Sequence, residues 1–187
     1  VKNPMVPLSL FQARNFVGAN VTTLGVYAAL QGTSFFLTLY IQNVMGYAPL
    51  VAGLMLAPVS LLLLVLSPFF GRWVGRYGPR RFMTLGPLVT AVGLVLLTGL
   101  QPTSSIWTEL LPYVAIFGLG LAGTVAPLTD TVMSAVSEKR SGVAAAFNNV
   151  VSRVAGLLAI AGVGVVLSLS FSQALERRTA DFNLSKS

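Results

Sequence analysis

Polar side chains spaced three or four positions apart interrupt an apolar stretch near the N-terminus. They are Asn20, Thr23, Tyr27, Gln31, Ser34 and Thr38. At 3.6 residues per turn this spacing puts all six on one face of a helix. Lipid does not accommodate such a face, so it indicates either one wall of a water-filled path or hydrogen bonding between packed helices. Bonding between helices usually needs one or two such residues, so the length of the face favours the water-filled path.

A second face of this kind occurs further along the chain. Its members also recur every three or four residues, and they are Tyr113, Phe117, Gly120, Thr124, Pro127, Thr131 and Ser134. Walls that combine aromatic rings with hydroxyl groups suit amphiphilic or apolar solutes. We therefore include Tyr113, Phe117 and Thr124 among the candidate substrate-cavity residues. Packing in the interior of the bundle is the equally weighted alternative.

Two ionisable residues lie at equal distances from position 141.5, which falls within the turn expected at 139–142. Asp130 precedes this turn and Arg153 follows it. In an antiparallel helix pair they lie at about the same depth, and a charge at that depth needs a partner or a wet cavity. The spacing predicts an ion pair just under the cytoplasmic surface. The alternative is an Arg153 side chain that extends to the interface beside a solvated Asp130.

Four arginines fall within ten positions of the stretch GRWVGRYGPRR, residues 71–81. We interpret this stretch as a tight turn between antiparallel helices, in which Gly78 and Pro79 favour the turn. A cation at the C-terminal end of a helix stabilises it by about 0.3 to 1 kcal/mol. The candidate loop residues are Gly71, Arg72, Arg76, Gly78, Arg80 and Arg81.

The elements that must position these residues are membrane helices. The 187 residues are 55% hydrophobic and 9% charged, whereas soluble domains are about 25% charged. A span needs roughly 20 apolar residues. Windows without charge and the turn signals between them predict an all-α membrane protein with five transmembrane helices, at about 16–42, 50–71, 82–100, 108–135 and 143–169. Residues 1–15 are expected to form a cytoplasmic linker or interfacial segment, and 176–187 an extracytoplasmic tail.

The distribution of lysine and arginine predicts the orientation and the partners. Basic residues accumulate in cytoplasmic loops, which places residue 1 and the 71–81 loop inside and the C-terminal tail outside, in a plasma or inner membrane. The net charge is +7. Because these cations flank membrane spans, anionic lipids are the expected partner and nucleic acid is not.

Several kinds of chemistry are disfavoured by composition. The sequence has no His and no Cys, which removes thiolate nucleophiles, His-based triads and Cys/His metal sites. We therefore expect no enzyme, no cofactor and no metal. Residues 118–123 match G-x-G-x-x-G, but they lie within an apolar helix. That placement favours close packing of small residues over dinucleotide binding.

The 71–81 stretch resembles the signature loop of the major facilitator superfamily. Further stretches resemble the C-terminal half of its fourteen-helix drug/proton antiporter branch, and these are 5–11, 40–47, 126–129 and 142–149 with Arg153. Gly75 stands where the family pattern usually has an acid, and Pro79 is inserted before the basic pair. A complete charge latch is therefore not expected in this loop.

The resemblance implies one part of a secondary transporter that exports amphiphilic drugs by alternating access, coupled to protons. It implies that the first and fourth helices line the cavity and that the arginines of the loop exchange partners during gating. It also implies that a sixth helix follows and that an N-terminal half of the same transporter, with the proton-coupling acid, is missing. The rival hypothesis is a polytopic membrane receptor or scaffold that transports nothing.

Overall fold

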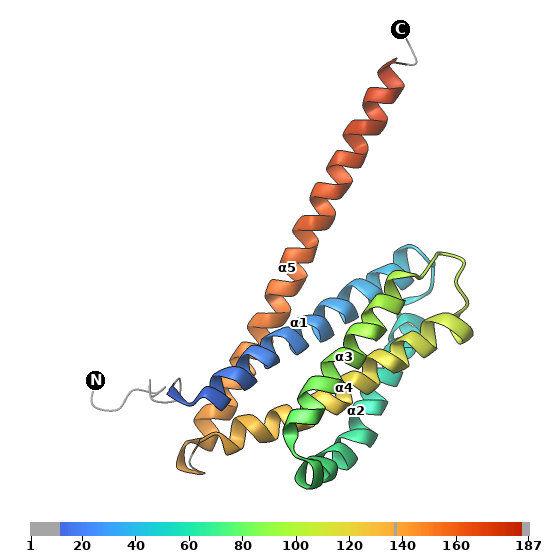
Figure 1. Cartoon of the computed structure of the whole chain (residues 1–187). Helices are drawn as coiled ribbons and strands as arrows, with labels where there is room; N and C mark the ends of the chain where they lie inside the picture. The colour runs from blue at the N-terminus through green and yellow to red at the C-terminus, as the bar shows by residue number, and fades with distance from the viewer. Residues whose placement is uncertain (1–11, 137, 185–187) are drawn as a thin grey trace.

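The computed structural model describes residues 12–136 and 138–184, and these form a bundle of long helices (Figure 1). The elements are α1 (Arg14–Asn43), α2 (Pro49–Tyr77), α3 (Pro79–Thr98), the π-helical turn η2 (Ile106–Leu110), α4 (Leu111–Ser134) and α5 (Glu138–Leu184). In the described part of the chain, five helices are long and apolar enough to cross a membrane. The predicted fold class, an all-α membrane protein with five such helices, is confirmed.

The turn predicted at residues 71–81 is much shorter than expected. Helix α2 continues to Tyr77 and α3 begins at Pro79, so Gly78 alone separates them. Gly78 has φ 80° and its N–H donates to Val74 O at 2.8 Å. A glycine adopts positive φ without steric cost, and proline at the first position of a helix loses no hydrogen bond. The arginines expected in a loop therefore lie on the last turns of α2 and the first turn of α3.

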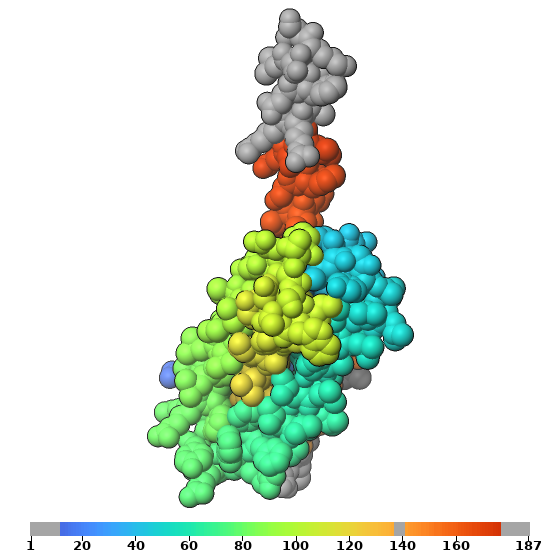
Figure 2. Space-filling view, turned by 90° about the vertical axis from the view of Figure 1, so that its right-hand side faces the viewer, coloured from blue at the N-terminus to red at the C-terminus, as the bar shows by residue number. Residues whose placement is uncertain are grey.

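Helix α5 is longer than predicted. The sequence placed its end near 169 and a tail from 176, but the helix continues to Leu184. No glycine or proline occurs after Gly164 to stop it, and the residues that follow include several good helix formers. The C-terminal part of α5 projects beyond the other helices, as Figures 1 and 2 both show.

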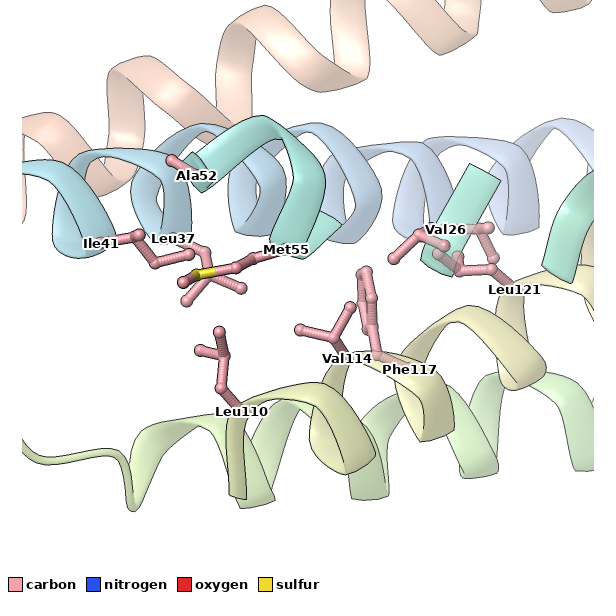
Figure 3. Packing of buried hydrophobic residues seen from close by; sticks show 10 residues of the cluster. Val26, Leu37, Ile41, Ala52, Met55, Leu110, Val114, Phe117 and Leu121 are labelled. Atoms are coloured by element: carbon pink, nitrogen blue, oxygen red, sulfur yellow. The ribbon is translucent and has the colours of Figure 1, made fainter. Parts of the chain in front are cut away.

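Helix α4 occupies the centre of the bundle and packs against each of the other four long helices. Side chains from α1, α2 and the η2–α4 segment point toward one another in one apolar cluster (Figure 3), formed by Val26, Leu37, Ile41, Ala52, Met55, Val59, Leu110, Val114, Phe117 and Leu121. A second cluster, with Phe16 and Leu128 at its centre, joins α1, α4 and α5. Together these clusters fix α1 against α4.

The contact between α3 and α4 depends on glycine. A Cβ added to Gly93 would lie 2.6 Å from the Phe117 Cα, and one added to Gly120 would lie 2.5 Å from the Thr90 hydroxyl oxygen. On the α2 side of α4, a Cβ at Gly118 would lie 3.0 Å from the Val59 Cα. Small residues let membrane helices approach this closely. The structure therefore agrees with the packing interpretation of the glycines at 118–123.

Candidate functional site

Two residues of the polar face of α1 bind α5. The Thr23 hydroxyl oxygen lies 2.7 Å from the Asn148 amide oxygen and 3.0 Å from Ala19 O. A hydroxyl has one proton to donate, so both contacts are satisfied if Asn148 turns its NH₂ group toward Thr23. Gln31 Nε2 donates to Ser152 O at 3.3 Å. These two residues therefore fulfil the helix-bonding alternative that the sequence left open.

Helix α5 accommodates Gln31 through a glycine. A Cβ at Gly156 would lie 2.5 Å from the Gln31 Cδ, so the amide lies directly on the α5 backbone. Asn148, Ser152 and Gly156 are spaced four apart and form the α5 side of this contact. The sequence alone did not place these residues at an interface with α1. Their small or polar character at helical spacing was the signal that could have revealed it.

Three other residues of the same face make no side-chain hydrogen bond to another helix in the described part of the chain. Tyr27, Ser34 and Thr38 are all half-buried. The Thr38 hydroxyl donates within its own helix, to Ser34 O at 2.6 Å. The face is thus divided between positions bonded to α5 and positions whose polar groups remain available.

Asn20 is buried and has a free acceptor. Its amide nitrogen donates to Phe16 O at 2.9 Å. Its Oδ1 has no hydrogen-bond partner among the described residues, although the side chain is only 7% exposed. A buried polar atom without a partner is costly, so it usually meets a water or a ligand group. Asn20 therefore offers one acceptor inside the bundle.

The structure does not bring the aromatic face of α4 opposite the polar face of α1. The Phe117 backbone lies against Gly93 of α3, and its ring points into the apolar cluster with α1 and α2. Thr124 is buried beside Gly86 of α3, while Tyr113 is half-buried. Core packing, the alternative left open for this face, is the role that Phe117 and Thr124 have here. The helical period identified a coherent face but carried no information about which neighbour it contacts.

Asp130 and Arg153 do not form the predicted ion pair. Both are exposed, and no ion pair joins them in the part of the chain that the structure describes. Asp130 instead lines a hollow of about 580 Å³ together with Val74 of α2, Pro79 of α3 and Ser141. Equal depth on two helices does not bring side chains together unless both helices also turn those side chains toward each other.

The arginines gather at one end of the bundle, which we call the cationic end and define by Arg14, Arg72, Arg76, Arg80 and Arg81. Arg72 Nε donates to Pro68 O at 3.3 Å, and its guanidinium carbon lies 4.9 Å from the centre of the Phe69 ring. The Arg76 guanidinium lies 5.6 Å from the centre of the Tyr77 ring. Both contacts are exposed, so the cations remain accessible to anionic groups.

Aromatic rings hold the α2–α3 turn at this end. The Phe70 ring centre lies 5.8 Å from that of Trp73 and 5.9 Å from that of Phe82, in edge-on arrangements. Gly75, at the position of the usual acid of the loop motif, faces open space. The turn is therefore stabilised by packing, and the surrounding arginines are not fixed by a carboxylate at position 75.

Four apolar spanning helices packed on a fifth, the central α4, with polar groups inside the bundle, define a polytopic membrane protein. Residues 2–160 match the family model of the Major Facilitator Superfamily. The chain therefore belongs to this superfamily, as the motifs of the sequence indicated.

Curated relatives are similar over nearly the whole chain. "Multidrug resistance protein Stp" of Mycobacterium tuberculosis is 33% identical over 93% of this chain and 32% of its own length. "Tetracenomycin C resistance and export protein" of Streptomyces glaucescens is 29% identical over 97% of this chain and 34% of its own. "Puromycin resistance protein pur8" of Streptomyces alboniger is 30% identical over 89% of this chain and 34% of its own length. The chain thus spans about a third of the length of these relatives.

Proposed function

We propose that this chain is one part of a longer secondary transporter that exports amphiphilic drug-like compounds by alternating access, coupled to protons. The names of the relatives, which include drug resistance and export, support this class of substrate. The family and the five spanning helices support transport rather than enzymatic chemistry. In this proposal a second half of the same transporter faces this one, and substrate binds between the repeats near the middle of the bilayer.

The observation that carries the proposal is the divided polar face of α1. Thr23 and Gln31 hold α1 on α5, while Tyr27, Ser34 and Thr38 keep polar groups that no other described helix engages. A membrane helix has little reason to keep three such groups at helical spacing unless water or solute reaches them. We assign these three residues to the cavity wall.

Asn20 extends this wall toward the cationic end. Its unpartnered Oδ1 suits a water molecule or the N–H or O–H group of an amphiphilic solute. Because the Phe117 ring packs in the apolar cluster and Thr124 is buried against α3, we do not place them in the wall, and we assign the cavity surface of α4 to another side of that helix.

The cationic end is proposed to face the cytoplasm of a plasma or inner membrane, because basic residues concentrate there. In that orientation Arg72, Arg76, Arg80 and Arg81 exchange anionic partners as the two halves move. Asp130 is one candidate partner, because it lines a hollow with Val74 and Pro79 at the α2–α3 turn. A gating contact with Arg153 instead requires α4 or α5 to rotate from the position that the structure shows.

Cysteine labelling tests the cavity wall, since the chain has no native cysteine. Single cysteines at Tyr27, Ser34 and Thr38 of the full-length protein, made cysteine-free elsewhere, are expected to react with an impermeant thiol reagent. A cysteine at Val21, 66% exposed on another side of α1, is the control and is expected to be shielded by lipid or by the remaining protein. An exported drug is expected to slow labelling at the three cavity positions only.

The rival hypothesis, a receptor or scaffold, makes the opposite prediction. A dry polar face would leave all three cysteines unreactive under conditions that favour either orientation of the transporter. Normal expression with no labelling would therefore refute the cavity and favour the scaffold.

A further inference from the structure

A groove separates α1 from α3 along the side of the bundle where both helices lie on α4. Its first hollow, of about 350 Å³, opens at the cationic end and is lined by Arg14, Gly18 and Thr22 of α1 and by Arg80 and Met83 of α3. A second hollow, of about 390 Å³, shares Thr22 and Met83 with the first. The two hollows therefore lie next to each other along the helix axes.

The mouth of this groove carries two positive charges. Arg14 and Arg80 are exposed and line the same hollow. Neither guanidinium makes an ion pair with a carboxylate among the described residues, and Asp130 lines a different hollow. Two like charges at one site repel each other, and an anion between them relieves that repulsion. The only side-chain amide in this hollow, Asn15, adds a further hydrogen-bond donor.

Beyond the arginines the lining becomes apolar. Gly25 and Ala29 of α1 face Pro87, Ala91 and Leu94 of α3 in the second hollow. The two threonines here turn their hydroxyls to their own helices: Thr22 donates to Gly18 O and Thr90 to Gly86 O, each at 3.0 Å. The groove thus changes from cationic to apolar with increasing depth.

The length of the two hollows matches one leaflet of a bilayer. Arg14 and Ala29 are fifteen positions apart, which is about 22 Å at 1.5 Å per residue. Half of a hydrocarbon core is about 15 Å, and the headgroup region occupies the remainder. We propose that this groove binds an anionic phospholipid, with its phosphate between Arg14 and Arg80 and one acyl chain lying along α1 and α3 as far as Leu94.

A transmembrane helix from the rest of the protein is the competing occupant. It would run the whole length of the bundle, including a third hollow of about 610 Å³ that begins at Leu94 and continues past Leu97 and Tyr40. The paired arginines favour the lipid, because a phosphate offers both guanidiniums charge-assisted hydrogen bonds. Basic pockets between membrane helices are known to bind anionic headgroups in this way.

Native mass spectrometry can measure how tightly phosphatidylglycerol binds to the purified full-length protein. This measurement tests the proposal independently of transport. One cation near an anionic headgroup changes affinity by about fivefold. We expect Arg14→Gln and Arg80→Gln each to weaken binding by about that factor, and the double variant by about 25-fold. Arg76→Gln is the matched control, because Arg76 lies over Tyr77 and outside the hollow. Equal affinity in the double variant and the control would overturn the proposal.

A second variant tests the acyl part of the site. Gly25 lines the second hollow and has no atom within 4 Å of an added Cβ, so we expect Gly25→Leu to place its side chain in that hollow. This variant is expected to lower the affinity for long-chain phosphatidylglycerol more than the affinity for an analogue with six-carbon acyl chains. If inorganic phosphate displaces the lipid at equal concentration, the site binds simple anions only. If Gly25→Leu leaves lipid affinity unchanged but lowers the yield of folded protein, a helix occupies the groove. Either result refutes the lipid assignment.

Discussion

Gly93 provides a direct test of how α3 is held on α4. The change Gly93→Ala adds a Cβ that would lie 2.6 Å from the Cα and N of Phe117 and 2.8 Å from its Cβ. Carbon atoms in contact are normally about 3.5 to 4.0 Å apart, so the helices must separate by about 1 Å. Phe117 presents backbone atoms here, which cannot rotate away as a side chain would. Overpacking of this kind costs about 1 to 3 kcal/mol.

The matched control is Gly53→Ala in α2, because an added Cβ there meets no atom within 4 Å. Both substitutions gain the same helix propensity, about 1 kcal/mol. The difference between them therefore isolates the α3–α4 contact. We expect Gly93→Ala to unfold more readily than Gly53→Ala by about 1 to 3 kcal/mol, measured on the full-length protein in detergent by the fraction that remains monodisperse after heating. Equal midpoints for the two variants would refute close α3–α4 packing.

Three further predictions concern other contacts. Thr23 is replaced by Val and Asn148 by Leu, singly and together. We expect a coupling energy of about 0.6 kcal/mol, and at most about 1.7 kcal/mol, as for other hydrogen bonds between membrane helices. Strictly additive effects on the free energy of unfolding would contradict the contact. Gly78→Ala is expected to destabilise the α2–α3 turn by about 1 to 2 kcal/mol, because a residue with a Cβ is strained at φ 80°. Unchanged stability of this variant would contradict the turn geometry. Asp130→Asn and Arg153→Gln are expected to act additively on stability, since no ion pair joins the two side chains among the described residues. A coupling above about 0.5 kcal/mol would show that they meet.

The helix count was predictable because it depends on a strong, additive signal. A charge-free stretch of about 20 residues has few alternatives to a membrane span. Helix ends were less predictable, because single residues decide them. Gly71 looked like the end of a helix, yet one internal glycine costs only about 1 kcal/mol and α2 continues past it. Gly78 ends the helix because its positive φ is followed by Pro79.

The candidate site was harder to predict than the fold. Helical period shows which residues share a face, and it identified both the polar face of α1 and the aromatic face of α4. It does not show what lies against each face, so Phe117 was assigned to a cavity although its ring packs in the apolar cluster with α1 and α2. The same limit applies to Asp130, whose depth followed from sequence but whose direction around the helix axis did not.

Packing in a bilayer explains why glycines and polar groups are the informative residues here. Lipid tails are as apolar as leucine, so burying apolar surface drives helix association far less than it does in water. The close approach of α4 to α3 depends on small residues. The contact between α1 and α5 includes two interhelical hydrogen bonds and Gly156. The many exposed leucines and valines of α2 and α5 are consistent with lipid or further protein around the bundle. Polar groups outside these contacts, such as Tyr27 and Ser34, therefore need an explanation of their own, and access of water or solute is the one that we propose.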